Sequence, residues 1–153
     1  MELIYIKELS KAYGKMKVLD HLSVSYESGK IYGLVGENGA GKTTLFNCIM
    51  GVTDYDGEIR KFSKMAVGYM PAESFFYSLI TGNEYLEFCI KAKGKKMDAK
   101  AIDSLNKAFQ LPLERFASDY STGMKKKLAL MSLLLQNNDL YILDEPFNGV
   151  DLY

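Results

Sequence analysis

Residues 36–43 have the types and the spacing that bind phosphate. They read Gly-Glu-Asn-Gly-Ala-Gly-Lys-Thr, which fits the pattern Gly-x-x-x-x-Gly-Lys-Ser/Thr. Glycines let the backbone turn tightly, so that successive N–H groups and the start of the following helix surround phosphate oxygens. We expect Lys42 to neutralise the β and γ phosphates and Thr43 to place its hydroxyl on Mg²⁺. The expected nucleotide contacts are Gly36, Asn38, Gly39, Ala40, Gly41, Lys42, Thr43 and Thr44.

The segments on both sides of this loop support that interpretation. The apolar run 31–35 predicts a strand, and Lys42–Met50, closed by Gly51, predicts a helix. The alternative is a glycine-rich turn with a surface lysine, which leaves the order of strand, loop and helix unexplained. The sequence therefore predicts an ATP site with Mg²⁺ as the metal ion.

A second apolar run, Leu140–Leu143, ends in two acids, Asp144 and Glu145. A parallel strand that is buried on both faces is apolar throughout in this way, and its carboxyl end is expected beside the phosphate loop. There Asp144 would hold Mg²⁺ through water, and Glu145 would orient and deprotonate the water that attacks the phosphate. For this run alone, the alternative is a strand end with two solvated acids.

Ser121 and Gly123 stand at the expected start of an apolar helix that precedes the acid pair. A helix N-terminus that carries a hydroxyl is a second anion site, and glycine permits close approach. The commoner role of such a serine is to cap its own helix, which is the alternative. The lysines at 125–127 are interpreted as the solvated first turn of that helix.

The remaining elements must position these residues. Short β-prone runs predict strands at 3–6, 18–19, 22–26, 57–60 and 66–70. Thr81 and Glu84 have the spacing of a capping box before a helix with apolar Tyr85, Leu86, Phe88 and Cys89. Asp98 is expected to cap a second helix, which ends before Pro112 and carries Ile102, Leu105, Ala108 and Phe109.

Composition narrows the class of protein. The 153 residues are 48% hydrophobic, which suits one domain, and 19 basic residues balance 19 acidic ones, so charge favours no nucleic-acid partner. Cys48 and Cys89 have no metal-ligand spacing and suit a reducing cytoplasm. The start shows no export signal, and the longest apolar run is too short to span a bilayer. Any membrane role is therefore expected to come through a partner.

Taken together, these motifs resemble the ATP-binding subunit of an ABC transporter over essentially the whole chain. Residues 121–124, Ser-Thr-Gly-Met, resemble the family's signature, and residues 148–151 resemble its D-loop. In that family two domains meet head to tail, and each ATP lies between one phosphate loop and the other domain's signature. The resemblance thus assigns Ser121 and Gly123 to a partner's nucleotide. It also matches Tyr13 to the aromatic that stacks on adenine, with a core tyrosine as the alternative.

Two features depart from the family's pattern. Ala72 stands where the family usually has a glutamine that touches the metal ion, and Glu73, which follows, is expected either to substitute as an oxygen ligand or to play no part. The chain also stops at Tyr153, soon after the D-loop, and His21, which we interpret as a surface residue, is its one histidine. We therefore expect a truncated core in which Leu140–Leu143 lacks a neighbour, and hence self-association or marginal stability.

The resemblance implies an α/β fold: a P-loop NTPase core with an antiparallel β subdomain and a helical insert, lacking its C-terminal part. Residues 1–153 would form one partial ABC ATPase domain, with β subdomain and core at 1–71 and 137–153 and the insert, including the signature helix, at 72–136. Aromatic residues at 74–77 are expected either to dock a membrane subunit or to be buried against the insert.

The expected function is ATP hydrolysis by the motor subunit of a transporter, with Glu145, Lys42 and Ser121 as catalytic residues. The expected partners are a second copy of the domain and a separate transmembrane permease, which would hold the chain at the cytoplasmic face of the membrane. The alternatives are a soluble ABC ATPase that acts on the ribosome or DNA, and a nucleotide-binding fragment without turnover.

Overall fold

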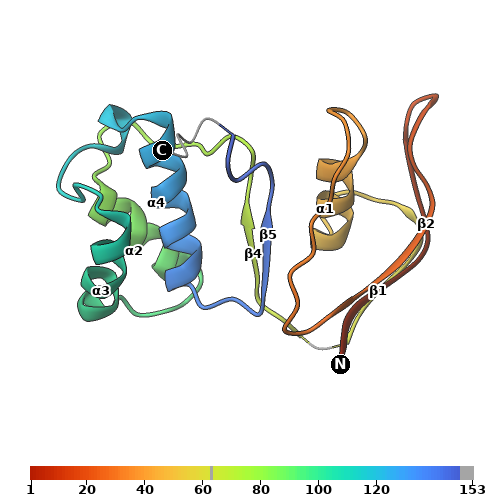
Figure 1. The fold of residues 1–153 in the computed structure, drawn as a ribbon, viewed down its shortest axis with the longest axis horizontal. Coiled ribbons are helices and arrows are strands. Elements are labelled where there is room, and N and C mark those ends of the chain that lie inside the picture. Colours follow the sequence, from red (N-terminus) through yellow and green to blue (C-terminus); the bar gives the residue numbers. More distant parts are fainter. Residues whose placement is uncertain (63, 149–153) are drawn as a thin grey trace. The chain divides into compact units, whose positions relative to one another are not determined.

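The computed structural model describes residues 1–62 and 64–148. The chain divides into two compact units, Met1–Met65 and Ala66–Tyr153, which are described separately. Figure 1 shows the ribbon coloured along the sequence. The D-loop expected at 148–151 has only its first residue, Asn148, among the described residues. The division into a core and an insert at 72–136 stays a prediction.

The first unit is built on a three-stranded antiparallel sheet. β1 (Glu2–Tyr13) and β2 (Met16–Glu27) form a hairpin, and β3 (Asp56–Lys61) pairs with the other edge of β1. The predicted strands are present, but β1 and β2 extend well beyond the predicted 3–6, 18–19 and 22–26. The strands are longer than the apolar runs because cross-strand hydrogen bonds continue into the polar half of the hairpin. The apolar runs indicate only its buried part.

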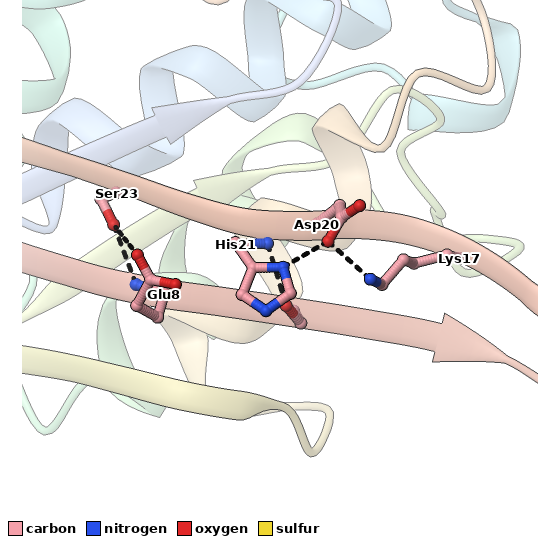
Figure 2. Close-up of polar contacts among 6 residues, drawn as sticks. Glu8, Lys17, Asp20, His21 and Ser23 are labelled. Atoms are coloured by element: carbon pink, nitrogen blue, oxygen red, sulfur yellow. Dashed lines mark hydrogen bonds and ion pairs between the residues drawn. The ribbon is translucent and has the colours of Figure 1, made fainter.

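Bulges at Glu8 and His21 are two of the register irregularities in the hairpin, and each is held by a serine on the opposite strand (Figure 2). Glu8 and His21 have positive φ values of 52° and 49°. The Glu8 N–H donates to Ser23 Oγ at 2.9 Å, and the His21 N–H donates to Ser10 Oγ at 2.9 Å. The extra residue at Glu8 explains why Leu9 is buried with Ile4 and Ile6, since a bulge shifts the alternation of faces by one residue. The interpretation of His21 as a surface residue is confirmed.

Figure 2 also shows Asp20 between Lys17 and His21. The Asp20 carboxylate lies 2.6 Å from Lys17 Nζ, and the bond from Lys17, followed by that from His21, holds the pKa of Asp20 below its ordinary value. All three side chains are exposed. These charges lie along β2, on the solvent side of the hairpin.

The strand predicted at 31–35 is wrong. The segment has no regular secondary structure, and Ile31 and Val35 are 101% and 97% exposed. A strand is stabilised by hydrogen bonds to a neighbour, and none of the strands in the described ranges pairs with this segment. The helix that follows, α1 (Lys42–Met50), has the predicted bounds and ends at Gly51 in the left-handed region, with φ of 74°.

Over its described residues, 66–148, the second unit combines a two-stranded parallel sheet with three α-helices. β4 (Val67–Met70) pairs with β5 (Leu140–Leu143), and the helices are α2 (Gly82–Ala92), α3 (Ala99–Phe109) and α4 (Thr122–Leu135). A short 3₁₀ turn, Ala117–Asp119, precedes α4. Figure 1 shows α4 between the sheet and the other two helices, in agreement with its contacts to α2, α3 and β4. No helix in the described part of the chain has the length and apolar character needed to cross a bilayer.

Side-chain burial in this unit departs from the sequence prediction at three places. Phe88 and Ala108 are exposed, because Leu86 and Ile90 of α2 and Ile102 of α3 define the buried faces and a helix turns every 3.6 residues. Tyr141 of β5 is also exposed, so β5 is parallel as predicted but is not buried on both faces.

The capping box at the start of α2 is confirmed and yields a test. Thr81 Oγ1 accepts the Glu84 N–H at 3.2 Å, and Glu84 Oε2 accepts the Thr81 N–H at 2.8 Å, which lowers the pKa of Glu84. We predict that Thr81→Ala lowers the free energy of unfolding by about 1 kcal/mol in urea titrations, because one helix N–H loses its acceptor. Thr81→Ser keeps the hydroxyl and should match the parent protein. Equal losses in both variants would contradict the cap.

Candidate functional site

Two separate constraints favour glycine at position 41, where the phosphate loop meets α1. Its φ of 91° lies in the left-handed region, which disfavours any residue with a Cβ. A Cβ at this position would also lie 3.0 Å from both the carbonyl oxygen and Cγ1 of Val18 in β2. Glycine alone therefore lets the loop turn into α1 while its backbone lies against the hairpin.

The residue at the cap position of α1 has no side chain to cap the helix. Gly41 occupies the cap position without a side-chain hydrogen bond, and the first turn holds no acidic residue. The first N–H groups of a helix have no partners within the helix, and they carry the positive end of its dipole. The start of α1 therefore suits an anion, and phosphate binding by the segment 36–43 stays a prediction.

The backbone at the start of the loop lies around the ammonium group of Lys42. Lys42 Nζ donates to the carbonyl oxygens of Gly36 at 2.7 Å and Glu37 at 2.8 Å. An ammonium has three N–H donors, so these two bonds leave one further N–H for an anion. Residues 36–40 and Thr43 are exposed, and Thr44 is half-buried. The structure thus brings the lysine and the first glycine of the pattern together, and their contact with phosphate stays a prediction.

Asp144 lies at the end of β5 and is held from β4. Its side chain is buried, and the residue is 3% exposed. The Asp144 N–H donates to the Met70 carbonyl at 2.9 Å, continuing the parallel pairing, and the Tyr69 hydroxyl lies 3.4 Å from Asp144 Oδ2. Burial, followed by the charge of Asp144, raises the pKa of Tyr69, so this phenol stays protonated and donates. Sequence reasoning missed Tyr69, and its hydroxyl in an apolar strand was the available signal.

Glu145 adopts an unusual backbone conformation next to a buried lysine. Its φ is 47°, and its carbonyl oxygen accepts a hydrogen bond from Lys126 Nζ at 2.6 Å. The interpretation of the lysines at 125–127 as a solvated turn is therefore wrong at Lys126, which is only 7% exposed. The reason is its position on α4, from which the ammonium reaches the main chain beyond β5. Asn148 Nδ2 donates to Glu145 Oε2 at 3.2 Å.

Ser121 caps α4 at the exposed end of the helix. Its Oγ accepts the Met124 N–H at 3.2 Å, so the capping alternative is confirmed. Ser121 is exposed and Gly123 is half-buried, which leaves the helix start open to a ligand. Its contact with a partner's nucleotide stays a prediction.

The remaining candidates lie on the surface. Tyr13, at the end of β1, is exposed, and Lys11 Nζ lies 5.2 Å from its ring centroid, so the core-tyrosine alternative is wrong. Stacking on adenine stays a prediction. Glu73 is exposed in the segment after β4. Its expected role as a metal ligand likewise stays a prediction.

The chemistry of Thr43 and Asp144 fits Mg²⁺. One is a hydroxyl and the other a carboxylate, and Mg²⁺ takes one or two protein oxygens together with water and phosphate. Among residues 1–62 and 64–148, no group of three or more His, Cys, Asp or Glu could hold a metal ion. The two residues belong to different units, Met1–Met65 and Ala66–Tyr153, so the prediction that the acid pair lies beside the phosphate loop remains a prediction.

Comparison with known proteins places these motifs in a family. A family model described as "ABC transporter" matches residues 19–148. The bacitracin transport ATP-binding protein BcrA of Enterococcus faecalis is 34% identical over 97% of this chain and 52% of its own length. The ABC-type transporter ATP-binding protein EcsA of Bacillus subtilis is 35% identical over 99% of this chain and 67% of its own length.

A solved structure agrees with the sequence relatives. An ATP-binding subunit of an ABC transporter superposes with a TM-score of 0.85 at 29% identity, covering 98% of this chain and 69% of the other. This chain spans 52% to 67% of the length of the two curated relatives above. The family match includes the phosphate loop, Ser121 and the acid pair. The chain belongs to the ABC transporter family, and its fold is that of the family's ATP-binding domain.

Proposed function

We propose that this chain binds and hydrolyses ATP as part of the motor subunit of a membrane transporter. The observation that carries the proposal is the phosphate loop, in which Gly41 lies against Val18 and Lys42 is held by the carbonyls of Gly36 and Glu37. ABC proteins bind ATP, so membership of the family indicates that ATP is the ligand of this loop.

The reaction is ATP plus water to ADP plus phosphate. Lys42 neutralises phosphate oxygens, and the N–H groups at the start of α1 hold the phosphate chain in place. Mg²⁺, when bound by Thr43 and, through water, by Asp144, supplies further positive charge. Glu145 orients the attacking water and takes its proton. Positioning and charge neutralisation thus contribute most of the rate, as is general for phosphoryl transfer.

A second copy of the chain completes the site in this proposal. Ser121 and Gly123 lie at the open start of α4, where a hydroxyl and helix N–H groups suit the phosphates of a nucleotide bound by the partner. The outer edge of β5, which pairs with β4 alone among the described strands, is a further place for association. Nucleic acid is not a partner in this proposal.

The permease contact is assigned to aromatic side chains of the second unit. Phe75, Tyr77 and Phe88 are 76%, 57% and 54% exposed. Their rings form a row, with centroids 5.3 Å apart for Phe75 and Tyr77 and 6.2 Å apart for Tyr77 and Phe88. Phe76, in contrast, packs against the helical core. Exposed aromatic clusters mark protein interfaces, and this one would hold the chain on the cytoplasmic face of the membrane.

Replacing the proposed base should separate binding from turnover. We predict that Glu145→Gln in the full-length protein keeps ATP affinity and lowers hydrolysis by about 10²- to 10⁴-fold, since an amide cannot accept the proton. Filter binding and phosphate release measure the two quantities.

The matched control for this substitution is Glu114→Gln in the same unit. Glu114 is exposed, and its Oε1 accepts a hydrogen bond from Asn83 at 2.6 Å that an amide oxygen can still accept. It should hydrolyse ATP at the parent rate. Undiminished hydrolysis by Glu145→Gln would refute the assignment of the base, and a parent protein that binds ATP without turnover would favour a nucleotide-binding fragment.

Substituting each of the two glycines that flank α1 distinguishes an effect on the phosphate site from an effect of backbone strain on the helix. We predict that Gly41→Ala weakens ATP binding by about 100-fold, because the left-handed backbone and the contact with Val18 each disfavour a Cβ by about 1–2 kcal/mol. Gly51→Ala suffers similar backbone strain at the other end of α1, where a Cβ would meet nothing within 4 Å. It should lose stability and keep ATP affinity. Equal affinity loss in both variants would assign the effect to unfolding of α1.

The exposed aromatic row can be tested by association with membranes. We predict that Phe75→Ser combined with Tyr77→Ser abolishes copurification of a multispanning membrane protein and leaves ATP binding unchanged. Phe62→Ser, an exposed phenylalanine of the other unit, is the control and should copurify as the parent does. Persistent association of the double variant would move the contact elsewhere.

A further inference from the structure

Lys126 is a charged side chain in a place that disfavours charge. It is 7% exposed, whereas Lys127 beside it is exposed and Lys125 is half-buried. A buried ammonium is costly unless it is hydrogen-bonded. Lys126 Nζ meets that need by donating to the carbonyl oxygen of Glu145 at 2.6 Å, a short distance typical of charge-assisted hydrogen bonds.

The carbonyl that Lys126 binds belongs to a residue in a disfavoured conformation. Glu145 has a φ of 47°, and a non-glycine residue stays in the left-handed region only where its surroundings hold it there. The Asn148 N–H donates to the same carbonyl oxygen at 3.2 Å, and Asn148 Nδ2 donates to Glu145 Oε2, also at 3.2 Å. Lys126 and Asn148 therefore hold Glu145 at its main chain, and Asn148 also holds its carboxylate.

The helix that carries Lys126, α4, is capped by Ser121. The Lys125 N–H donates to the Ser121 carbonyl at 2.9 Å, so the cap and the turn that leads to Lys126 are joined by helical hydrogen bonds. A shift of the start of α4 must move Lys126 with it, since an α-helix is a rigid element over one or two turns. One side chain thus links the start of α4 to the backbone of Glu145.

We propose that Lys126 is a positioning residue for Glu145. Its buried ammonium holds the Glu145 backbone in the left-handed conformation, and this sets the direction of the carboxylate toward the attacking water. Because Lys126 moves with α4, the direction of the carboxylate depends on where Ser121 sits. This inference rests on the proposed role of Glu145 as general base. It adds a route by which engagement of Ser121 with a partner's nucleotide adjusts hydrolysis in the same chain.

The test compares three lysine variants of the full-length protein. Lys126→Met has a similar length and no donor, and we expect its kcat for ATP hydrolysis to fall by about 10- to 100-fold with KM and ATP affinity unchanged, as for a misplaced catalytic group. Lys126→Arg retains a charged donor and should recover part of the loss. Lys127→Met, at an exposed neighbour, should match the parent. A parental kcat in Lys126→Met would overturn the proposal.

A second arm shows whether Lys126 acts through Glu145. In a Glu145→Gln background the base is already absent, so Lys126→Met should lower the residual rate less than two-fold, or about 0.4 kcal/mol. A full additional loss in that background would overturn the proposal, because Lys126 would then act elsewhere or on folding. If Glu145→Gln alone retained the parental rate, the proposed function of Glu145 would fail, and with it the need for a positioning residue. Failure of the positioning role would therefore be seen in the Lys126→Met variants, and failure of the base assignment in Glu145→Gln alone.

Discussion

The close approach of Gly41 to Val18 is the contact on which the phosphate loop depends. It presses the start of α1 against β2, and the Leu45 N–H then bonds to the Gly41 carbonyl as the first bond of the helix. Leu45, Cys48 and Ile49 bury the inner face of α1. The hairpin acts on the loop through this close packing. Its role is to fix where α1 begins, so that Lys42 and the first N–H groups of α1 lie next to each other.

In the second unit, α4 is the element whose packing positions the candidate site residues. Leu128 and Met131 pack into the cluster formed with α2 and α3, while Ala129 and Leu133 pack with Met70 of β4. A helix that is buried on two sides cannot shift without disturbing both neighbours, because protein interiors are close-packed. This packing makes Ser121, at the helix start, and Lys126, one turn later, parts of one element, so a shift at one is passed to the other and to the acid pair at the end of β5.

The features predicted correctly from sequence depend on local signals. Lys42–Met50, the capping box at Thr81 and the cap at Ser121 each rest on residues a few positions apart. The phosphate-loop pattern is equally local, since it spans 36–43 alone. Where a local signal and the tertiary structure agree, sequence reasoning identifies both the element and its bounds.

The features that were missed depend on distant partners. The run 31–35 has the composition of a strand but pairs with none of the described strands. Whether such a run finds a pairing partner depends on the rest of the chain and cannot be deduced from its own residues. Lys126 is a solvated lysine by residue type, and only the carbonyl of Glu145, 19 positions later, explains its burial. The bulge at Glu8 likewise depends on Ser23, 15 positions away on the other strand.

The bulge at His21 has a consequence for how the protein behaves among other chains. β2 is 12 residues long and lies at an edge of its sheet, and a long, flat edge strand is a template for the strands of neighbouring molecules. The bulge at His21 and the charges of Lys17 and Asp20 interrupt that edge near its middle. The hairpin is thereby protected against edge-to-edge aggregation, which matters most while the chain is newly made and crowded by its own copies.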